Sequence, residues 1–416
     1  MTDLISQGSY GCIFKPGFTC KGKPTQSKKY ITKIQKREDT SSKETNIGEI
    51  IKKIDDYEDF FAPILKTCEI SLAQIEDNSV TRCNFIEENN NKKYESNKLR
   101  YVGENTISKY ILDVVDNNAN SLIRVLIESH KNLLVGFNKL FSAGIVHLDV
   151  KENNIMIDDN TKNPIIIDFG LSSEINSLSD NKYRDVFFVY GPDYEPWCID
   201  ICMITYMANE LKDQKNPYDG MLGFIGFEEN KTKNWMEWMV TKENITKVIN
   251  DFIKKNTAII HFFNEKKRNE YSKKLHDYFN SFIGKTWKEL AENLILNIPS
   301  WDCYAVSIIY LRILHDIDLQ TVDISLSSWN SYKQTLENMI LSQPDKRMNC
   351  NDMIKTLDDL FKNISSSENI KLKTMLNNVS KNKKNKMNIR KNVLTSIQNN
   401  LHNEQNVYQA MRNKTI

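Results

Sequence analysis

The stretch His-Leu-Asp-Val-Lys-Glu-Asn-Asn occupies residues 147–154, and Asp-Phe-Gly follows at residues 168–170. Two short apolar runs lie between these motifs, so both motifs are expected in loops at the ends of strands. A carboxylate such as Asp149 can orient a hydroxyl group and accept its proton. Carboxylate and amide oxygens are also the ligands that Mg²⁺ prefers, which makes Asn154 and Asp168 candidate metal ligands. The chemistry of this part of the chain is therefore expected in two neighbouring loops.

The two motifs resemble the catalytic loop and the Asp-Phe-Gly motif of protein kinases, with fourteen positions from Asn154 to Asp168. The resemblance covers about residues 4–362. It implies an α+β, two-lobed fold, in which a small sheet-plus-helix lobe precedes a mainly helical lobe and ATP and Mg²⁺ bind between them. We expect the first lobe at 1–105, the second at 106–362 and a tail at 363–416.

The resemblance implies a role for each polar residue of the two motifs. Asp149 would be the base, while Asn154 and Asp168 would hold Mg²⁺ or, in its place, Mn²⁺. Lys151 would place its ammonium beside the transferring phosphoryl group. In the family, a lysine at this position accompanies specificity for serine and threonine. We therefore expect transfer of the γ-phosphate to Ser/Thr hydroxyls of protein substrates.

The stretch Ile-Ser-Gln-Gly-Ser-Tyr-Gly-Cys-Ile at residues 5–13 has the layout of a glycine-rich hairpin that covers phosphates. Glycine leaves the backbone free to approach a phosphate closely. Ser6 stands where the family has its first glycine, and we expect nucleotide binding to survive that change. The candidate nucleotide-binding residues are Ile5, Ser6, Gly8, Ser9, Gly11 and Ile13, together with Lys33.

The alternating segment at 30–34 resembles the strand that carries the nucleotide-holding lysine, which makes Lys33 the expected ligand of the α- and β-phosphates. Its carboxylate partner should come from the next helix, predicted at 43–54 from apolar residues spaced three and four apart. Glu44 shares the apolar face of that helix, whereas Glu49 lies with its lysines. We expect Glu44 as the partner, with Glu49 as the alternative.

The second lobe opens with a helical pattern at 122–141 that ends at Gly144, and apolar runs at 155–157 and 165–167 predict two paired strands. The adenine-binding hinge is expected at 99–104, where Gly103 resembles the small residue that begins the second lobe. Further helical patterns occupy 248–263, 271–294 and 303–314.

Two later residues resemble structural elements of the same family. Asp302 resembles the aspartate that braces the catalytic loop, and Arg347 resembles a late arginine that pairs with an acid at the end of the activation segment. Here that acid is expected to be Asp193 or Glu195. About a hundred residues separate that segment end from Asp302, where the family has about a dozen, which implies a helical insertion at about 208–300.

The insertion, a tryptophan after the acid and heavy use of Asn, Lys and Ile resemble most the divergent kinase-like proteins of large DNA viruses. The location expected is intracellular and cytoplasmic, in a host cell or virion for a viral protein. No apolar run approaches the length of a membrane span, and the start of the chain has no leader-like pattern. Eight cysteines occur singly, which favours reduced thiols.

Charge is balanced overall but not along the chain. The chain has 56 Lys and Arg and 54 Asp and Glu, which gives a net charge of +2. The overall charge therefore does not indicate a polyanionic partner. The tail at 363–416 carries ten Lys and Arg against two Glu, with apolar residues four apart from 389 to 401. It could form a basic amphipathic helix that docks on an acidic partner, nucleic acid or anionic lipid, or remain solvated.

Several departures from the family pattern leave alternatives open. Leu148 replaces the arginine that in many regulated kinases receives an activation-loop phosphate, so we expect activity without loop phosphorylation. Ser6, Leu148 and the loose end of the activation segment allow a pseudokinase that only binds nucleotide or a partner. The large insertion suits a small-molecule kinase of the same fold, whereas Lys151 and Asp-Phe-Gly favour a protein substrate.

Overall fold

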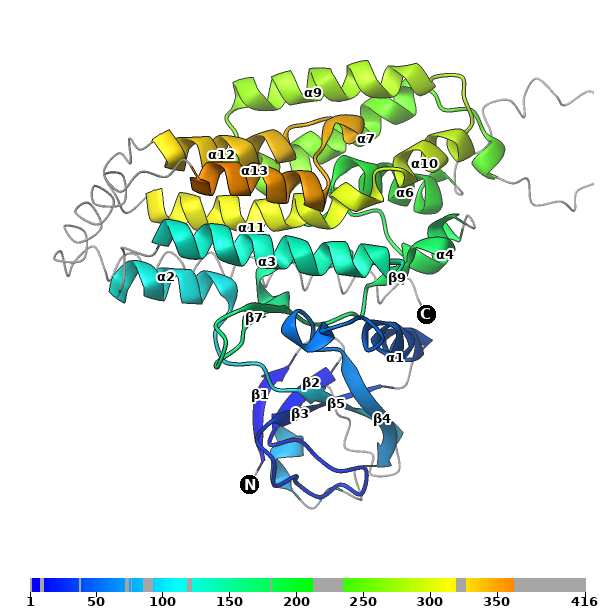
Figure 1. Cartoon of the computed structure of the whole chain (residues 1–416). Coiled ribbons are helices and arrows are strands. Elements are labelled where there is room, and N and C mark those ends of the chain that lie inside the picture. The colour runs from blue at the N-terminus through cyan, green and yellow to red at the C-terminus, as the bar shows by residue number, and fades with distance from the viewer. Residues whose placement is uncertain are drawn as a thin grey trace, which may run out of the picture. The chain divides into compact units, whose positions relative to one another are not determined.

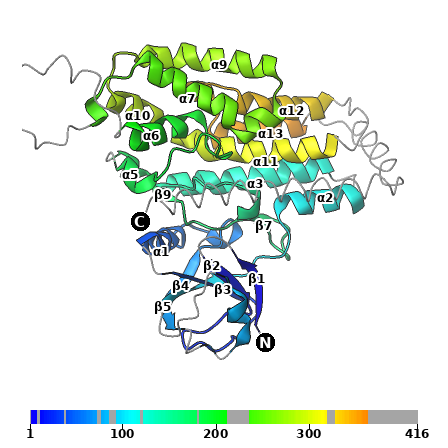
Figure 2. The same cartoon turned by 180° about the vertical axis from the view of Figure 1, so that it is seen from behind.

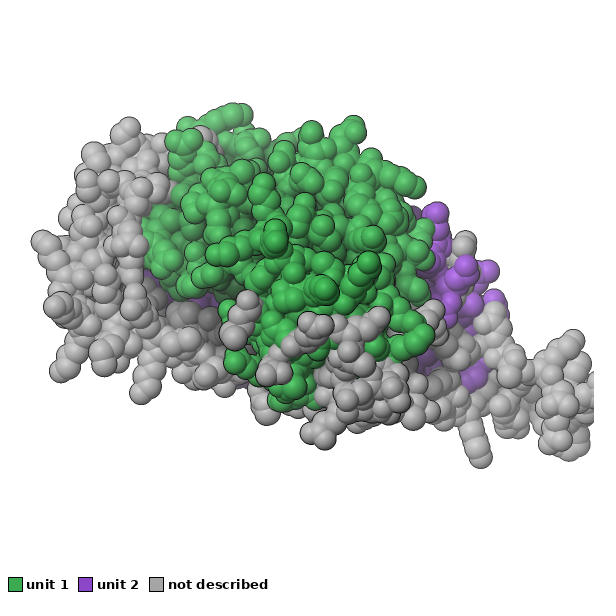
Figure 3. Space-filling model, turned by 90° about the horizontal axis from the view of Figure 1, so that it is seen from below, with its two compact units in different colours: residues 1–174, 354–383 green, residues 175–353, 384–416 purple. Residues whose placement is uncertain are grey.

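The computed structural model describes residues 2–7, 11–36, 39–71, 75, 77–84, 93–117, 122–179, 182–211, 235–318 and 327–362 (Figure 1). Within these residues, the chain up to Glu174 and from Ile354 onward forms one compact unit, and Ile175–Met353 form a second (Figure 3). The predicted tail at 363–416 lies outside the described residues. The lobe boundary predicted near residue 105 falls inside the first unit and stays a prediction.

A five-stranded antiparallel sheet in the order β1-β2-β3-β5-β4 begins the first unit (Figure 1). The strands predicted within 4–15 and at 30–35 are confirmed. β4 was not predicted, because Lys, Thr, Glu and Ser interrupt the apolar pattern of its sequence. The strands are β1 (Asp3–Gln7), β2 (Gly11–Lys15), β3 (Tyr30–Lys36), β4 (Ile64–Ser71) and β5 (Lys93–Arg100).

The helix predicted at 43–54 is α1 (Asp39–Ile51), which packs on β4. Its side chains Ile47 and Ile51 are buried, as their spacing along the predicted apolar face requires. Thr45 of α1 hydrogen-bonds Thr67 of β4 at 3.2 Å between hydroxyl oxygens, which fixes the sheet face that α1 covers. Side chains that alternate with Thr67 along β4 therefore point to the opposite face.

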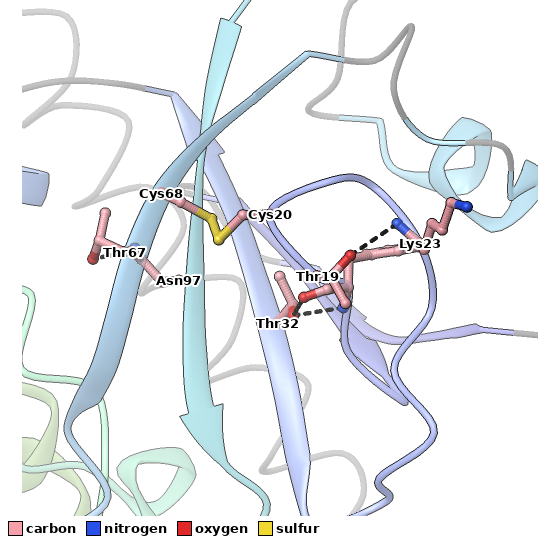
Figure 4. Close-up of a disulfide and its surroundings, with 8 residues drawn as sticks. Thr19, Cys20, Lys23, Thr32, Thr67, Cys68 and Asn97 are labelled. Carbon is pink, nitrogen blue, oxygen red and sulfur yellow. Dashed lines mark hydrogen bonds between the residues drawn. A yellow bond between two sulfur atoms is a disulfide. The ribbon is translucent and has the colours of Figure 1, made fainter.

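That opposite face carries a small apolar core of its own. Cys68 follows Thr67 on β4 and forms a disulfide with Cys20, which lies in the long connection between β2 and β3 (Figure 4). A second disulfide joins Cys12 at the start of β2 to Cys83 in the connection between β4 and β5. The buried members of the core are Cys12, Phe14, Phe18, Ile34, Ile70, Val80, Cys83 and Tyr94.

The expectation of eight reduced thiols is therefore wrong for four of the cysteines. Each pair spans a long stretch of sequence, with separations of 71 and 48 residues, and the partners meet only because both connections cross the same sheet face. The other four cysteines, Cys198, Cys202, Cys303 and Cys350, are free and buried.

Replacing Cys20 with Ser should lower the free energy of unfolding of the oxidised protein by about 2–4 kcal/mol, because the disulfide restricts the unfolded chain. Urea denaturation measures the change, and the same substitution in fully reduced protein serves as the control because it removes no cross-link there. Peptide mapping under non-reducing conditions should recover Cys20 joined to Cys68. Four alkylatable thiols in the sheet of air-oxidised protein would contradict the pairing.

The rest of the first unit supplies loops and the helix behind them. The predicted helix at 122–141 and the paired strands at 155–157 and 165–167 are confirmed, and Gly144 follows the helix with a φ of 77°. Left-handed backbone of this kind ends helices and favours glycine. The elements are α2 (Ile107–Asn117), α3 (Leu122–Ser142), β6 (Ile145–Val146), β7 (Ile155–Ile157), β8 (Pro164–Ile166) and β9 (Ser173–Glu174), with α13 (Cys350–Lys362) shared between the units.

Among its described residues, the second unit is helical apart from turns (Figure 1, Figure 2). The pattern at 248–263 is broken at Asn256, whose side chain accepts a hydrogen bond from Ile259 N and so starts a new helix. The pattern at 271–294 is broken before Thr286, which forms a capping box with Glu289. The helices are α4 (Ile175–Ser179), α5 (Tyr183–Val186), α6 (Ile199–Asn209), α7 (Lys242–Lys255), α8 (Thr257–Phe262), α9 (Glu265–Phe279), α10 (Trp287–Ile295), α11 (Trp301–Asp318) and α12 (Ser327–Ile340).

In the part of the chain that the structure describes, no single helix is long and apolar enough to cross a membrane, and only a pair bent by 51°, Trp287–Ile295 with Ile298–Ile317, reaches the required length and composition.

Candidate active site

Lys33 holds two carboxylates from distant parts of the first unit. Its Nζ lies 3.1 Å from Glu44 Oε2 on α1 and 3.4 Å from Asp168 Oδ1 of Asp-Phe-Gly. The strand register places Lys33 beside Ile13 and Asn97, on the sheet face that α1 covers. Glu49, the alternative partner, is exposed and pairs with Lys52 instead. The structure thus brings Glu44 to Lys33, as the apolar face of the helix indicated.

Burial and charge act in opposite directions on these groups. Burial favours the neutral form of Lys33, but the Asp168 and Glu44 carboxylates outweigh it and raise the pKa of the ammonium. Burial likewise opposes ionisation of Asp168, yet the positive charge of Lys33, followed by that of Lys151, holds its pKa below the ordinary value. At neutral pH the site therefore contains a charged lysine and a charged Asp168, ready to meet phosphate and a cation.

Backbone hydrogen bonds fix Asp168 relative to the sheet. Ile166 of β8 donates its N–H to Phe60 O at 2.8 Å and accepts from Ala62 N at 3.0 Å, which ties β8 to the turn that leads into β4. Asp158, in the turn between β7 and β8, pairs with Arg100 at the end of β5 at 3.2 Å. Asp168 follows β8 by two residues, so these bonds hold it close to Lys33.

The loop at 147–154 is closed by its own side chains. Asn154 donates its Nδ2 to both Asp149 O and Asp149 Oδ2 at 2.9 Å, and Lys151 Nζ lies 3.3 Å from Asp149 Oδ1. Asp149 is 2% exposed, so these contacts are what compensates its burial. The carboxylate is thus oriented before any substrate arrives.

His147 links the two motifs. Its Nδ1 accepts from Asp149 N at 3.2 Å, which leaves Nε2 to donate to Ile167 O at 3.3 Å. The imidazole ring packs against the Phe169 ring with centroids 5.2 Å apart, and Phe169 in turn meets Phe61. Asp149 and Asp168 are therefore held in one packed arrangement.

Both motifs contain a non-glycine residue with left-handed backbone. Leu148 has a φ of 64° and Asp168 a φ of 61°. This conformation costs about 1–2 kcal/mol for residues with a Cβ and is seldom seen for leucine. Such strain gathers at functional sites, where the surrounding contacts enforce it.

The residues predicted to bind a metal fit a magnesium ion. Asn154 uses its amide nitrogen for Asp149, so its amide oxygen is the atom left for a cation. Asn154 O also accepts from Ile167 N at 2.9 Å, which places the two predicted ligands on adjoining backbones. Among the described residues no group of three or more His, Cys, Asp or Glu could hold a metal. A two-ligand site suits Mg²⁺, because this ion usually keeps waters and binds substrate phosphates.

The glycine-rich hairpin is described only in part. Gly8 and Ser9 lie outside the described residues, while Ile5 is 47% exposed and Ser6 pairs with Ile13 between β1 and β2. Gly11 is constrained by the sheet itself, since a Cβ there would lie 2.3 Å from Ile34 O. The roles of these residues toward a nucleotide stay predictions.

The predicted partner of Arg347 is wrong. Arg347 pairs at 2.6 Å with Asp200 of α6, and both side chains are 0% exposed. Trp301 Nε1 donates to the same Asp200 carboxylate at 3.3 Å. Asp193 is exposed, and Glu195 pairs with Arg312. Asp302 lies in the first turn of α11, and its bracing of the catalytic loop stays a prediction.

Three features together define the protein kinase fold. They are the five-stranded sheet with α1 packed on it, the pairing of Lys33 with α1 and with Asp-Phe-Gly, and the closed loop around Asp149. The family model of the protein kinase domain matches residues 2–357, and the chain belongs to this family. It is also similar to the CTD kinase subunit alpha of Saccharomyces cerevisiae, with 28% identity over 152 residues. That match covers 31% of this chain and 28% of the yeast protein.

Replacing Glu44 with Gln should lower kcat/KM for phosphate transfer by about tenfold or more, because the negative charge that pairs with the Lys33 ammonium is lost. The matched control is Glu49→Gln on the same helix, which should leave kcat/KM within twofold because its side chain is exposed. Steady-state kinetics with varied ATP measures both. Equal losses in the two variants would contradict the assignment of Glu44.

Replacing Arg347 with Met should lower the free energy of unfolding by about 3–5 kcal/mol, since Asp200 would be left as an uncompensated buried charge. Lys346→Met is the control, because Lys346 pairs with Asp345 at the surface and surface ion pairs contribute about 0–1 kcal/mol. Chemical denaturation compares them. A loss below 1 kcal/mol for Arg347→Met would show that the buried pair is unimportant.

Proposed function

We propose that this chain is an active serine/threonine protein kinase, which transfers the γ-phosphate of ATP to hydroxyl groups of protein substrates. The observation that carries the proposal is the double pairing of Lys33 with Glu44 and Asp168, in the same unit as the closed loop around Asp149. The Lys33 and Glu44 side chains are only 13% and 5% exposed, and charges buried to this extent are costly unless they are paired. This is the arrangement that a nucleotide-binding, phosphate-transferring site requires.

Each residue would act on a different part of the reaction. Asp149 would orient the acceptor hydroxyl and accept its proton while the hydroxyl oxygen bonds to the γ-phosphorus and the bond to the β–γ bridging oxygen breaks. Lys33 would neutralise the α- and β-phosphates, and Lys151 the transferring group. Asn154 and Asp168 would hold Mg²⁺ or Mn²⁺, whose positive charge offsets that of the phosphates.

Specificity for serine and threonine rests on two observations. Lys151 contacts Asp149 at 3.3 Å, as expected for a lysine that meets the phosphoryl group beside the base. The chain is also similar over part of its length to a yeast protein named as a CTD kinase subunit.

Two other functions remain as alternatives. A pseudokinase is favoured by Ser6 and Leu148, but Lys33, Asp149, Asn154 and Asp168 are all present, which supports transfer. A small-molecule kinase would use the same base and metal ligands, and the large insertion is the feature that favours it.

The viral origin, the cytoplasmic location and the partner of the basic tail are proposed from the sequence alone. The viral likeness rests on composition and on the insertion. The two disulfides argue against a cytoplasmic location, because the reducing cytosol keeps thiols reduced. The basic tail is proposed to meet an acidic partner or nucleic acid.

Replacing Asp149 with Asn should lower the rate of transfer by about 10²–10⁴-fold, because the base is removed while the shape is kept. The control is Asp159→Asn, an exposed carboxylate of the nearby turn, which should retain wild-type activity. The measurement uses labelled ATP, Mg²⁺ and a mixed protein pool, followed by mapping of the labelled residues. Serine and threonine should carry the label. Equal amounts of label with the wild type and with Asp149→Asn would favour the pseudokinase alternative. Label on tyrosine would contradict the predicted specificity.

A further inference from the structure

The stretch at 187–197, which leads from the Asp-Phe-Gly segment into α6, is anchored by helices of the insertion. Tyr190 donates its hydroxyl to Asp251 Oδ2 of α7 at 3.1 Å. Lys247 and Lys255 of the same helix each lie 2.9 Å from the Asp251 carboxylate. Asp251 thus keeps its charge, and its pKa is lowered below the ordinary value because the two lysines outweigh the effect of burial. Tyr190 therefore donates to a fixed anion.

Aromatic packing supports the same anchor. The Tyr190 ring meets the Tyr206 ring of α6 edge to face, with centroids 5.4 Å apart. Farther along, Trp197 packs edge to face against both Phe187 and Tyr194. Such pairs contribute about 0.5–1.5 kcal/mol each beyond the burial of their area. The backbone between Phe187 and Trp197 is therefore held at both ends.

A second anchor lies five residues beyond Tyr190. Glu195 accepts a hydrogen bond at 3.0 Å from Thr257 Oγ1, the first residue of α8, and its other carboxylate oxygen pairs with Arg312 of α11. The Glu195 and Arg312 side chains are only 19% and 11% exposed, so solvent screens the pair weakly. Either Asp193 or Glu195 was expected to pair with Arg347. Arg347 pairs with Asp200 instead, and Glu195 binds Thr257 of the predicted insertion.

We propose that the insertion is a built-in clamp, in which Asp251 and Thr257 are positioning residues that hold 187–197 ready for the acceptor protein without phosphorylation. The inference rests on the proposed kinase function. Where a kinase is switched by phosphorylation, the added phosphate orders this segment through charge-assisted hydrogen bonds. Here the carboxylates of Asp251 and Glu195 take the place of an added phosphate. They already bind Tyr190, Thr257 and Arg312. This agrees with Leu148 standing where a phosphate-binding arginine would be.

The clamp predicts a specific kinetic signature for Tyr190→Phe and Thr257→Val, each of which removes one hydrogen bond to a carboxylate. Either variant should lower kcat/KM for the protein substrate by at least about fivefold, because a hydrogen bond to a charged group is lost. KM for ATP should not change, since both side chains belong to the second unit whereas Lys33, Glu44 and Asp168 belong to the first. Lys254→Ala, on the exposed side of α7, is the matched control and should behave as wild type.

The experiment uses the full chain made in a host without protein kinases and treated with phosphatase, with amide hydrogen exchange of 187–197 as a second readout. Exchange should quicken in Tyr190→Phe and Thr257→Val but not in Lys254→Ala. Wild-type protein that needs phosphorylation for activity would overturn the clamp, as would variants with unchanged kcat/KM and unchanged exchange. Inactive wild-type protein would defeat the kinase proposal alone, because the exchange measurement still decides whether the clamp exists.

Discussion

The ammonium of Lys33, whose side chain is 13% exposed, sets the organisation of the first unit. A charge in that position is tolerated only with carboxylates beside it, and the two that it has come from α1 and from the loop after β8. The sheet, the helix and the Asp-Phe-Gly loop must therefore adopt one relative position for all three charges to be paired. The backbone hydrogen bonds of Ile166 and the Arg100–Asp158 ion pair also hold the loop after β8 to the sheet.

Around this pairing, the chain uses carboxylates in two distinct ways. Asp149 lies beside the ammonium of Lys151, and Asp168 lies beside that of Lys33. Both acids belong to motifs that contain a residue with left-handed backbone. Asp200 is fully buried with Arg347, and the contacts of Asp251 and Glu195 fasten residues 187–197 to α7 and α8. The first pair lies in the two predicted catalytic motifs, whereas the others hold helices and a loop of the second unit together.

The sequence predicted which residues meet around Lys33 and Asp149 better than it predicted the contacts that support them. Lys33, Asp149 and Asp168 stand in motifs whose spacing is local, and Glu44 could be told from Glu49 by its place on the apolar face. Asp200 was missed although it carries a signal, since the one charged residue of the buried helix α6 needs a buried partner. The disulfides could not be predicted, because the sheet register decides which cysteines share a face. Tyr190 and Asp251 meet only through the packing of α6 and α7.

The most direct test of the central claim is a crystal structure of the chain with Mg²⁺ and an ATP analogue that cannot be hydrolysed. Lys33 Nζ should lie within hydrogen-bonding distance of the α- or β-phosphate, with oxygens of Asn154 and Asp168 on the metal and the terminal phosphate facing Asp149. A nucleotide bound away from Lys33, or a metal held without Asn154 and Asp168, would contradict the account.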